Sequence, residues 1–249
     1  MMDAYRVLDR RGPEFAVMWA QDAPGLERLL QLHGESAASL LLMPSYEAGT
    51  GDSLLYHSVN HEWANGVALC LKYGADPQRL EPYRRETPLR FAQRWLKGAT
   101  DERLSHAQYI LVLLGDADYT VDTPIIDATG DDSTALMRAA DKNDYYALAF
   151  LMAQRGANPH ARDRRGRTAL YYAISRVNRQ RRQQERLQRT AVGRRNADAQ
   201  VAPLLDPSIA LLIERVDPIP YEYGFPKVVA HIRQEAARRL RAQAGAPFR

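Results

Sequence analysis

His57 and His61 form the pair of residues whose spacing comes closest to a metal site. They stand four residues apart, and at that spacing two imidazoles on one helix can bind the same zinc ion. The metalloprotease form of this motif has Glu directly after the first His, whereas this chain has Ser58. No third ligand lies nearby in the sequence. Packed or solvated histidines are the alternative interpretation, and we predict no metal site.

Other chemically useful patterns are also incomplete. The chain has neither a G-x-S-x-G nucleophile motif nor a phosphate-binding P-loop. Cys70 lies in the apolar stretch ALCLKYG, which favours a core residue over a reactive thiolate. The aspartates after Gly115 resemble a calcium loop, but Val121 occupies the position that requires Gly and Thr120 replaces a carboxylate. We therefore expect a protein that is not an enzyme and binds no cofactor.

The composition is that of a soluble globular protein. Hydrophobic residues make up 45% and charged residues 26% of the 249 positions. No apolar run approaches the roughly 20 residues needed to cross a bilayer. The N-terminal residues MMDAYRVLDRRGPEF lack the apolar segment of a signal peptide, and a single cysteine suits a reducing compartment. A cytoplasmic protein without membrane contact is the expectation.

Charge is distributed unevenly along the chain. Between Arg162 and Arg195, twelve arginines stand against only Asp163 and Glu185, although the whole chain carries a net charge of only +4. This basic segment has few apolar residues and good helix formers, which predicts a solvated extension of a helix. It could bind an acidic protein surface, attract nucleic-acid phosphates, or do neither.

Four segments repeat a common pattern. They are SLLYHSV at Ser53, TPLRFAQ at Thr87, TALMRAA at Thr134 and TALYYAI at Thr168. The first two start 34 residues apart, as do the last two. The first three are followed by a second apolar stretch that ends at a glycine: CLKYGADP, LVLLGDAD and FLMAQRGANP.

Local physical chemistry explains this pattern as pairs of short helices. A Thr or Ser hydroxyl can cap a helix, and Pro88 suits the first turn because its missing N–H has no partner there. Gly74 and Gly156 stand where a helix ends and a positive φ is favoured. Each short helix has only a narrow apolar stripe, which must be buried by stacking neighbouring repeats.

The pattern resembles the ankyrin repeat, with its Thr-Pro-Leu helix start, second helix and Gly-Ala-Asp turn. This resemblance implies an all-α fold, an α-solenoid of about five helix-turn-helix repeats with hairpin-like connecting loops and a C-terminal capping helix. We expect a single domain over residues 1–249, whose repeats span approximately 13–45, 51–82, 85–120, 132–163 and 166–218, with a basic insertion at 176–206 and the cap at 226–243.

Departures from the repeat predict further features. The first helix pair should divide at Ala23-Pro24-Gly25, and its second helix should be followed by a hairpin in LLLMPSYEAGTGD. A second hairpin is expected in YTVDTPIIDATGDD. Extra residues around LKGATDERL and in the basic insertion should project from one edge of the repeats. An exposed acidic finger is also expected, formed by Asp116, Asp118, Asp122, Asp127, Asp131 and Asp132.

The ankyrin resemblance implies a protein-binding scaffold that uses its concave face and its fingers. Aligning the repeats carries this role onto Asn60, His61, Tyr83, Arg84, Glu86, Arg94, Trp95, Asp131, Asp141, Lys142, Arg164, Arg165, Arg167 and Arg176. Such a scaffold could be an inhibitor, an immunity protein or an adaptor for a partner protein. The alternative hypothesis is a nucleic-acid-associated protein that uses the Arg-rich insertion at 176–195.

Overall fold

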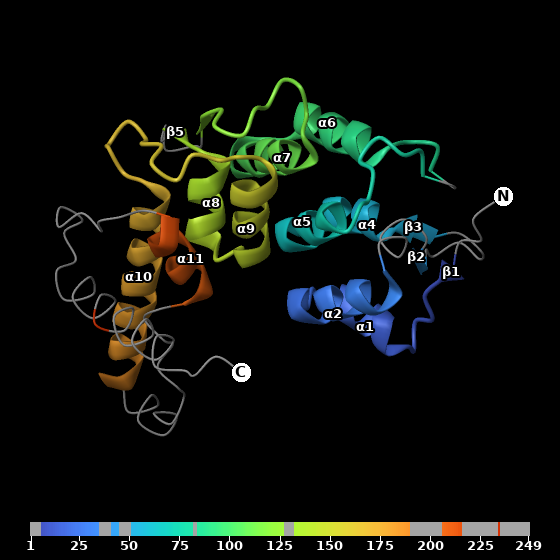
Figure 1. The fold of residues 1–249 in the computed structure, drawn as a ribbon, viewed down its shortest axis with the longest axis horizontal. Helices are drawn as coiled ribbons and strands as arrows, with labels where there is room; N and C mark the ends of the chain where they lie inside the picture. Colours follow the sequence, from blue (N-terminus) through green and yellow to red (C-terminus); the bar gives the residue numbers. More distant parts are fainter. Residues whose placement is uncertain are drawn as a thin grey trace, which may run out of the picture. The chain divides into compact units, whose positions relative to one another are not determined.

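The computed structural model describes residues 6–34, 41–44, 51–81, 84–126, 132–189 and 206–215, and residue 234. Most of these residues are helical (Figure 1). The chain divides into two compact units. Unit 1 comprises Met1–Leu136 and Asp144–Asn158, and unit 2 comprises Met137–Asn143 and Pro159–Arg249. The predicted capping helix at 226–243 lies outside the described residues except for Gln234.

Unit 1 holds most of the short helices. They are α1 (Pro13–Trp19), α2 (Ala23–His33), α4 (Leu54–Asn60), α5 (Ala64–Lys72), α6 (Pro88–Gly98), α7 (Asp101–Leu114) and α9 (Tyr145–Gln154). Its strands are β1 (Arg6–Val7), β2 (Leu41–Pro44), β3 (Gly51–Ser53), β4 (Ile125–Ile126) and β5 (Asp132–Ser133). Unit 2 holds nearly all of α8 (Ala135–Lys142), together with α10 (Ala169–Arg189) and α11 (Pro207–Arg215).

The strands form two small sheets, so the all-α class is only partly correct. β2 pairs antiparallel with β3, with Leu42 opposite Ser53, and β4 pairs antiparallel with β5. Both pairs lie in the long connections where the sequence predicts hairpins. The sequence did not predict β1, which pairs in parallel with β2 and extends its ladder through the Leu8 N–H, 2.8 Å from the Leu42 carbonyl oxygen.

Side-chain caps define where several helices begin. The Ser53 hydroxyl accepts a hydrogen bond from the Tyr56 N–H over 3.0 Å at the start of α4. Thr87 caps α6 in the same way. The division predicted at Ala23-Pro24-Gly25 is wrong: these residues form the first turn of α2, because Asp22 caps that helix and Pro24 is tolerated in its first turn.

One turn recurs between paired helices. Gln21, Glu62 and Asn143 have φ values of 53°, 55° and 65°, and each stands between two successive helices. Around the first two, the hydrogen bonds also match. Gln21 and Glu62 donate to carbonyls three residues back, and the next residue donates to a carbonyl five residues back. This shared geometry aligns Trp19, Asn60 and Asp141 as equivalent positions near the ends of first helices.

The third helix pair departs from that geometry. The extra residues around LKGATDERL were expected to project from the repeat, but they lengthen α6 and α7 instead. Only Ala99 and Thr100 lie between the two helices, and Ala99 has an extended conformation. The insertion adds helical turns because it contains good helix formers and Gly98 is tolerated at the helix end.

The core of unit 1 is built around α5, which packs against α2, α4, α7 and α9. Val67, Leu69 and Cys70 are fully buried on α5, as expected for Cys70. The direct contact of α5 with α9 differs from a strictly sequential stack, in which α7 would separate them. Asn65 contributes to this contact, because its side-chain oxygen accepts hydrogen bonds from the Tyr146 and Ala147 N–H groups at the start of α9.

Glycine ends the second helices, as predicted. Gly74, Gly115 and Gly156 have φ values of 82°, 78° and 69°. The residue after Gly74, Ala75, donates its N–H to the Cys70 carbonyl oxygen over 2.9 Å. Asp116, after Gly115, donates its N–H to the Leu111 carbonyl oxygen over 3.1 Å. This is the Schellman arrangement, which needs a left-handed residue and satisfies carbonyls at the helix end.

Unit 2 is organised along α10, which packs against α11. Leu170, Ala173, Ile174 and Val177 are buried on one side of α10. Beyond them the helix continues to Arg189, so the predicted helical extension is confirmed up to that residue. The remainder of the basic insertion, up to residue 205, lies outside the described residues.

Candidate protein-binding surface

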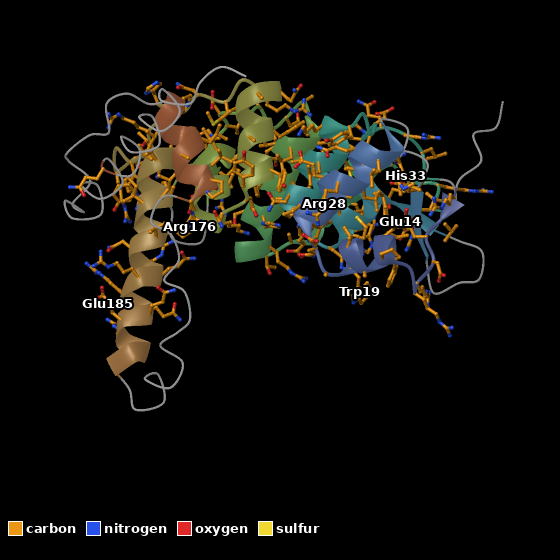
Figure 2. The ribbon with its side chains drawn as sticks, turned by 60° about the horizontal axis from the view of Figure 1, so that its bottom comes forward. Glu14, Trp19, Arg28, His33, Arg176 and Glu185 are labelled. Carbon is orange, nitrogen blue, oxygen red and sulfur yellow. The ribbon has the colours of Figure 1, made fainter. Side chains whose placement is uncertain are left out.

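A row of aromatic side chains joins α1 to α4. The Phe15 and Trp19 rings stack with their centroids 5.8 Å apart, and Trp19 meets His61 edge-on at 6.1 Å. The ring centroid of His61 in turn lies 4.2 Å from that of His57. Trp19 is 60% exposed (Figure 2). We call Phe15, Trp19, His57 and His61 the aromatic row.

Trp19 was missing from the sequence prediction because the first helix pair lacks the Thr-Leu-Ala start. The Gln21 turn shows that Trp19 is equivalent to Asn60 on the next helix pair. Asn60 and His61, both predicted, lie exposed at the end of α4. The signal that could have revealed Trp19 was the length of PEFAVMWAQD, which equals that from Leu54 to Trp63.

His57 carries no charge at neutral pH. It is buried, and burial together with His61 lowers the pKa of His57 to about 4. Among the described residues, no group of three or more His, Cys, Asp or Glu side chains is placed to bind a metal ion. The two histidines instead contribute packing and ring contacts to the aromatic row.

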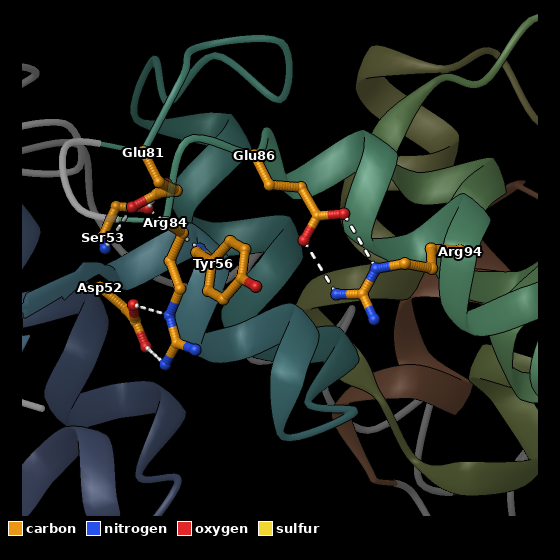
Figure 3. A network of polar contacts seen from close by, with 7 residues as sticks. All are labelled: Asp52, Ser53, Tyr56, Glu81, Arg84, Glu86 and Arg94. Atoms are coloured by element: carbon orange, nitrogen blue, oxygen red, sulfur yellow. Dashed lines mark hydrogen bonds and ion pairs between the residues drawn. The ribbon is translucent and has the colours of Figure 1, made fainter. Parts of the chain in front are cut away.

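A polar network crosses α4, α6 and the turn that precedes α6 (Figure 3). Arg84 donates two hydrogen bonds to the Asp52 carboxylate, at 2.8 Å and 3.0 Å, and its guanidinium lies 5.6 Å from the centre of the Tyr56 ring. The ring centroids of Tyr56 and Phe91 lie 4.9 Å apart. Burial is the main cause that raises the pKa of Tyr56 to about 12, so its hydroxyl stays protonated.

The other side of this network pairs two predicted site residues. Arg94 lies over the Phe91 ring at 5.0 Å and donates to both carboxylate oxygens of Glu86, at 3.0 Å and 2.9 Å. The hydrogen bond from Arg94 lowers the pKa of Glu86. Arg84, Glu86 and Arg94 therefore lie on the surface as expected, but each is already paired within the chain.

Glu81 holds the turn against α4. It is 4% exposed, and its carboxylate accepts hydrogen bonds from the Ser53 hydroxyl at 2.5 Å and the Ser53 N–H at 2.9 Å. Burial raises the pKa of Glu81, because few charges offset the loss of hydration. Nothing in the surrounding polar sequence distinguishes this buried glutamate from its exposed neighbours.

Two predicted positions lie outside the described residues: Tyr83 and Asp131. Trp95 is half-buried and packs edge-on against His106 of α7 at 6.1 Å. Its ring thus contributes to the contact between α6 and α7 while part of it remains accessible.

The predicted acidic finger is not a uniform exposed cluster. Asp116 is 6% exposed and accepts a hydrogen bond from the Gln93 side chain over 2.7 Å, so it belongs to the core of unit 1. Asp122 accepts a hydrogen bond from the Asn158 N–H. Asp116 and Asp122 thus bind groups elsewhere in unit 1, whereas Asp127 and Asp131 lie outside the described residues.

The predicted site residues of unit 2 divide into exposed and packed groups. Lys142, Arg164 and Arg165 are exposed, and Asp141 forms an ion pair with Arg179. Arg167 is half-buried and forms an ion pair with Asp163.

Arg176 does not lie on a binding surface, contrary to the prediction. Arg176, which lies on α10 (Figure 2), is 5% exposed and forms an ion pair with Asp206. Asp206 also caps α11 by accepting a hydrogen bond from the Ile209 N–H. The pair therefore ties α10 to the start of α11. The sequence placed Arg176 in the basic segment but gave no sign of its acidic partner thirty residues away.

Within the described part of the chain, no helix combines the length and apolarity needed to span a bilayer. A search of curated proteins found no match to the chain. Residues 126–181, from the end of β4 into α10, match the family described as ankyrin repeats (many copies). Over these residues, the match supports the resemblance to ankyrin repeats found in the sequence.

Proposed function

We propose that this protein is a non-enzymatic scaffold that binds another protein through the aromatic row and the neighbouring surface of α4 and α6. Ankyrin repeats generally mediate protein–protein interactions and are typically non-catalytic. The observation that carries the proposal is the exposed Trp19 ring, stacked on Phe15 and in contact with His61. Tryptophan dominates many binding interfaces because it buries a large apolar area at a small entropic cost.

The ring contacts support this role because they hold Trp19 in place before a partner arrives. Phe15 restricts one face of the indole, and His61 contacts its edge. A side chain already ordered in the free protein loses less conformational entropy on binding. The partner should offer an apolar pocket for the indole.

The charges along α6 indicate what else the partner should carry. Arg90 and Lys97 are exposed and form no ion pair among the described residues, whereas Arg94 is neutralised by Glu86. A partner with carboxylates facing α6 would complement the two cations. The predicted contacts Asn60, His61, Arg84, Glu86, Arg94 and Trp95 remain part of this proposal. The exposed Lys142, Arg164 and Arg165 of unit 2 are a separate set of proposed partner contacts.

Site-specific crosslinking in the native host tests the proposal directly. A photoreactive phenylalanine analogue would replace either Trp19 or Asn60, and Leu32 would provide the control. Leu32 is 84% exposed and lies on α2, which contributes no residue to the aromatic row. We expect the same protein to crosslink from both test positions and not from Leu32. Capture from Leu32 alone would place the binding surface elsewhere.

The captured partner then distinguishes the finer roles. An inhibitor or immunity protein should form a stoichiometric complex in which the partner loses its activity. An adaptor should leave that activity intact and bring a second protein into the complex. In either case Trp19→Ala should weaken binding at least about tenfold, the effect of a hot-spot side chain, without lowering thermal stability.

A further inference from the structure

The outer part of α10 is a helix surface made entirely of polar and charged side chains. From Asn178 to Arg186 the sequence is NRQRRQQER, without an apolar or aromatic residue. The side chains from Arg179 to Gln183 are exposed, as are those of Glu185 and Arg186. Nothing in this segment can contribute to a hydrophobic core, in contrast to the first two turns of the same helix.

Three arginines share one face of this segment. Arg179, Arg182 and Arg186 are spaced by three and four residues, which places them along one side of an α-helix. Gln180 and Gln184 lie instead on the same side of the helix as the buried Ala173 and Val177, opposite the three arginines. The arginine face, as we call Arg179, Arg182 and Arg186, therefore points away from the packed side of α10.

The arginines differ in how they are paired. Arg179 forms an ion pair with Asp141, and Arg181, which is not part of the arginine face, pairs with Glu185 over 2.9 Å. Arg182 and Arg186 are exposed and form no ion pair among the described residues. Arg182 and Arg186 can therefore bind an anionic partner. The preceding part of α10 is fixed by the ion pair between Arg179 and Asp141 and by the buried pair of Arg176 and Asp206.

The chemistry of the segment favours a nucleic acid over a protein. Protein interfaces need an apolar or aromatic centre from which water is excluded, and residues 178–186 provide none. Phosphate contacts need only arginine and other hydrogen-bond donors, and the segment consists of Arg, Gln, Asn and one Glu. The lack of an aromatic residue also disfavours a single strand, because unpaired bases bind by stacking on rings.

We propose that the arginine face of α10 binds the phosphate backbone of a double-stranded nucleic acid without recognising its sequence. An α-helix can lie in or across the groove of a duplex, where its arginines contact backbone phosphates. This surface belongs to unit 2 and does not depend on the protein-binding surface proposed for unit 1.

Binding of the full-length protein to a labelled random-sequence DNA duplex of about 20 base pairs tests this proposal over a series of salt concentrations. The test variant is Arg182→Gln with Arg186→Gln. The control variant, Gln180→Glu with Gln184→Glu, changes the net charge by the same amount on the opposite side of the helix. Because neither arginine is paired among the described residues, both variants should unfold at nearly the wild-type temperature.

For the wild type we expect affinity to fall steeply with salt. The test variant should bind more weakly than the wild type. The plot of the logarithm of its association constant against the logarithm of salt concentration should be less steep by about 2, one unit for each lost phosphate contact. The control variant should keep the wild-type slope. An unchanged slope in the test variant would overturn the proposal, as would equal losses in both variants.

Two further probes separate the competing partners. A single strand of the same sequence should bind more weakly than the duplex, since the segment offers no ring for stacking. Polyglutamate represents an acidic protein. If it bound as tightly as the duplex and depended equally on Arg182 and Arg186, the surface would be a general acidic-partner site and the nucleic-acid proposal would be wrong.

Discussion

The Arg167 guanidinium donates a hydrogen bond to the Asp163 carboxylate over 2.6 Å, and the Asp163 side chain is only 1% exposed. The same carboxylate also accepts hydrogen bonds from the Arg165 and Arg167 N–H groups and from the Tyr172 hydroxyl. Burial alone would raise its pKa, but these hydrogen bonds outweigh burial and lower the pKa of Asp163. Arg167 thus stabilises the turn before α10, although the sequence suggested a partner contact.

Arg167→Gln should lower the free energy of unfolding by about 2–4 kcal/mol, because it leaves a buried carboxylate without its cation. Arg164→Gln, at an exposed position of the same turn, should change it by less than about 1 kcal/mol. Urea unfolding of the two variants measures the difference. Equal effects would mean that the Asp163 carboxylate does not depend on Arg167.

The buried His57 predicts a loss of stability in mild acid. Its pKa is about 4 in the folded protein against 6.5 as the ordinary value, so the unfolded chain takes up a proton first as the pH falls. The free energy of unfolding should therefore decrease from about pH 6.5 to pH 4, by at most about 3 kcal/mol from this group.

The variant His57→Gln isolates this contribution in urea titrations at several pH values. Subtracting its pH dependence from that of the wild type should leave a decline confined to the interval between pH 4 and 6.5. His61→Gln should retain most of that decline, because burial is the larger cause of the shift and His61 the smaller one. A wild type and His57→Gln variant with parallel pH profiles would contradict the burial of a neutral imidazole.

Asn65 caps α9 from a different helix, and its loss should be measurable. Its side-chain oxygen lies 3.0 Å from the Tyr146 nitrogen and 3.2 Å from the Ala147 nitrogen. Asn65→Ala should lower the free energy of unfolding by about 1–2 kcal/mol, the usual cost of removing a helix cap. Asn60→Ala, at the exposed end of α4, should cost less than about 0.5 kcal/mol. If Asn65→Ala were as mild as Asn60→Ala, the contact between α5 and α9 would not depend on this cap.

Two leucines test whether the repeated apolar positions form a core. Leu136 is fully buried on α8, and Leu136→Ala should cost about 2–5 kcal/mol through the cavity that it leaves. Leu80 is 58% exposed, and Leu80→Ala should cost less than about 1 kcal/mol. Thermal or urea unfolding of both variants provides the comparison. A cost below about 1 kcal/mol at Leu136 would show that the repeat's apolar stripe faces solvent.

Features that depend on neighbouring residues were predictable from the sequence. Ser53 and Thr87 cap their helices, and Gly74 and Gly156 end theirs with positive φ, as their residue types indicated. The helical extension of α10 followed from the high helix propensity of Arg and Gln. In each case the hydrogen bonds form within a few residues, so local chemistry is sufficient.

The candidate site was only partly predictable. Aligned repeats located Asn60, His61 and Arg94 on the surface, but Trp19 emerged only once the Gln21 turn could be compared with that at Glu62. The mutual pairing of Arg94 with Glu86 was also invisible in the sequence, because residue types alone do not show which charges neutralise each other.

The sequence by itself determined the paired helices, their caps and the resemblance to ankyrin repeats, which the family match supports over residues 126–181. Only the tertiary structure decided which charged side chains are buried in ion pairs within the protein. Arg176 and Arg182 stand six residues apart on one helix, yet Asp206 buries the first while the second remains exposed. The difference in burial depends on Asp206, thirty residues after Arg176 in the chain. Packing of α11 against α10 brings the Asp206 carboxylate to Arg176 and not to Arg182.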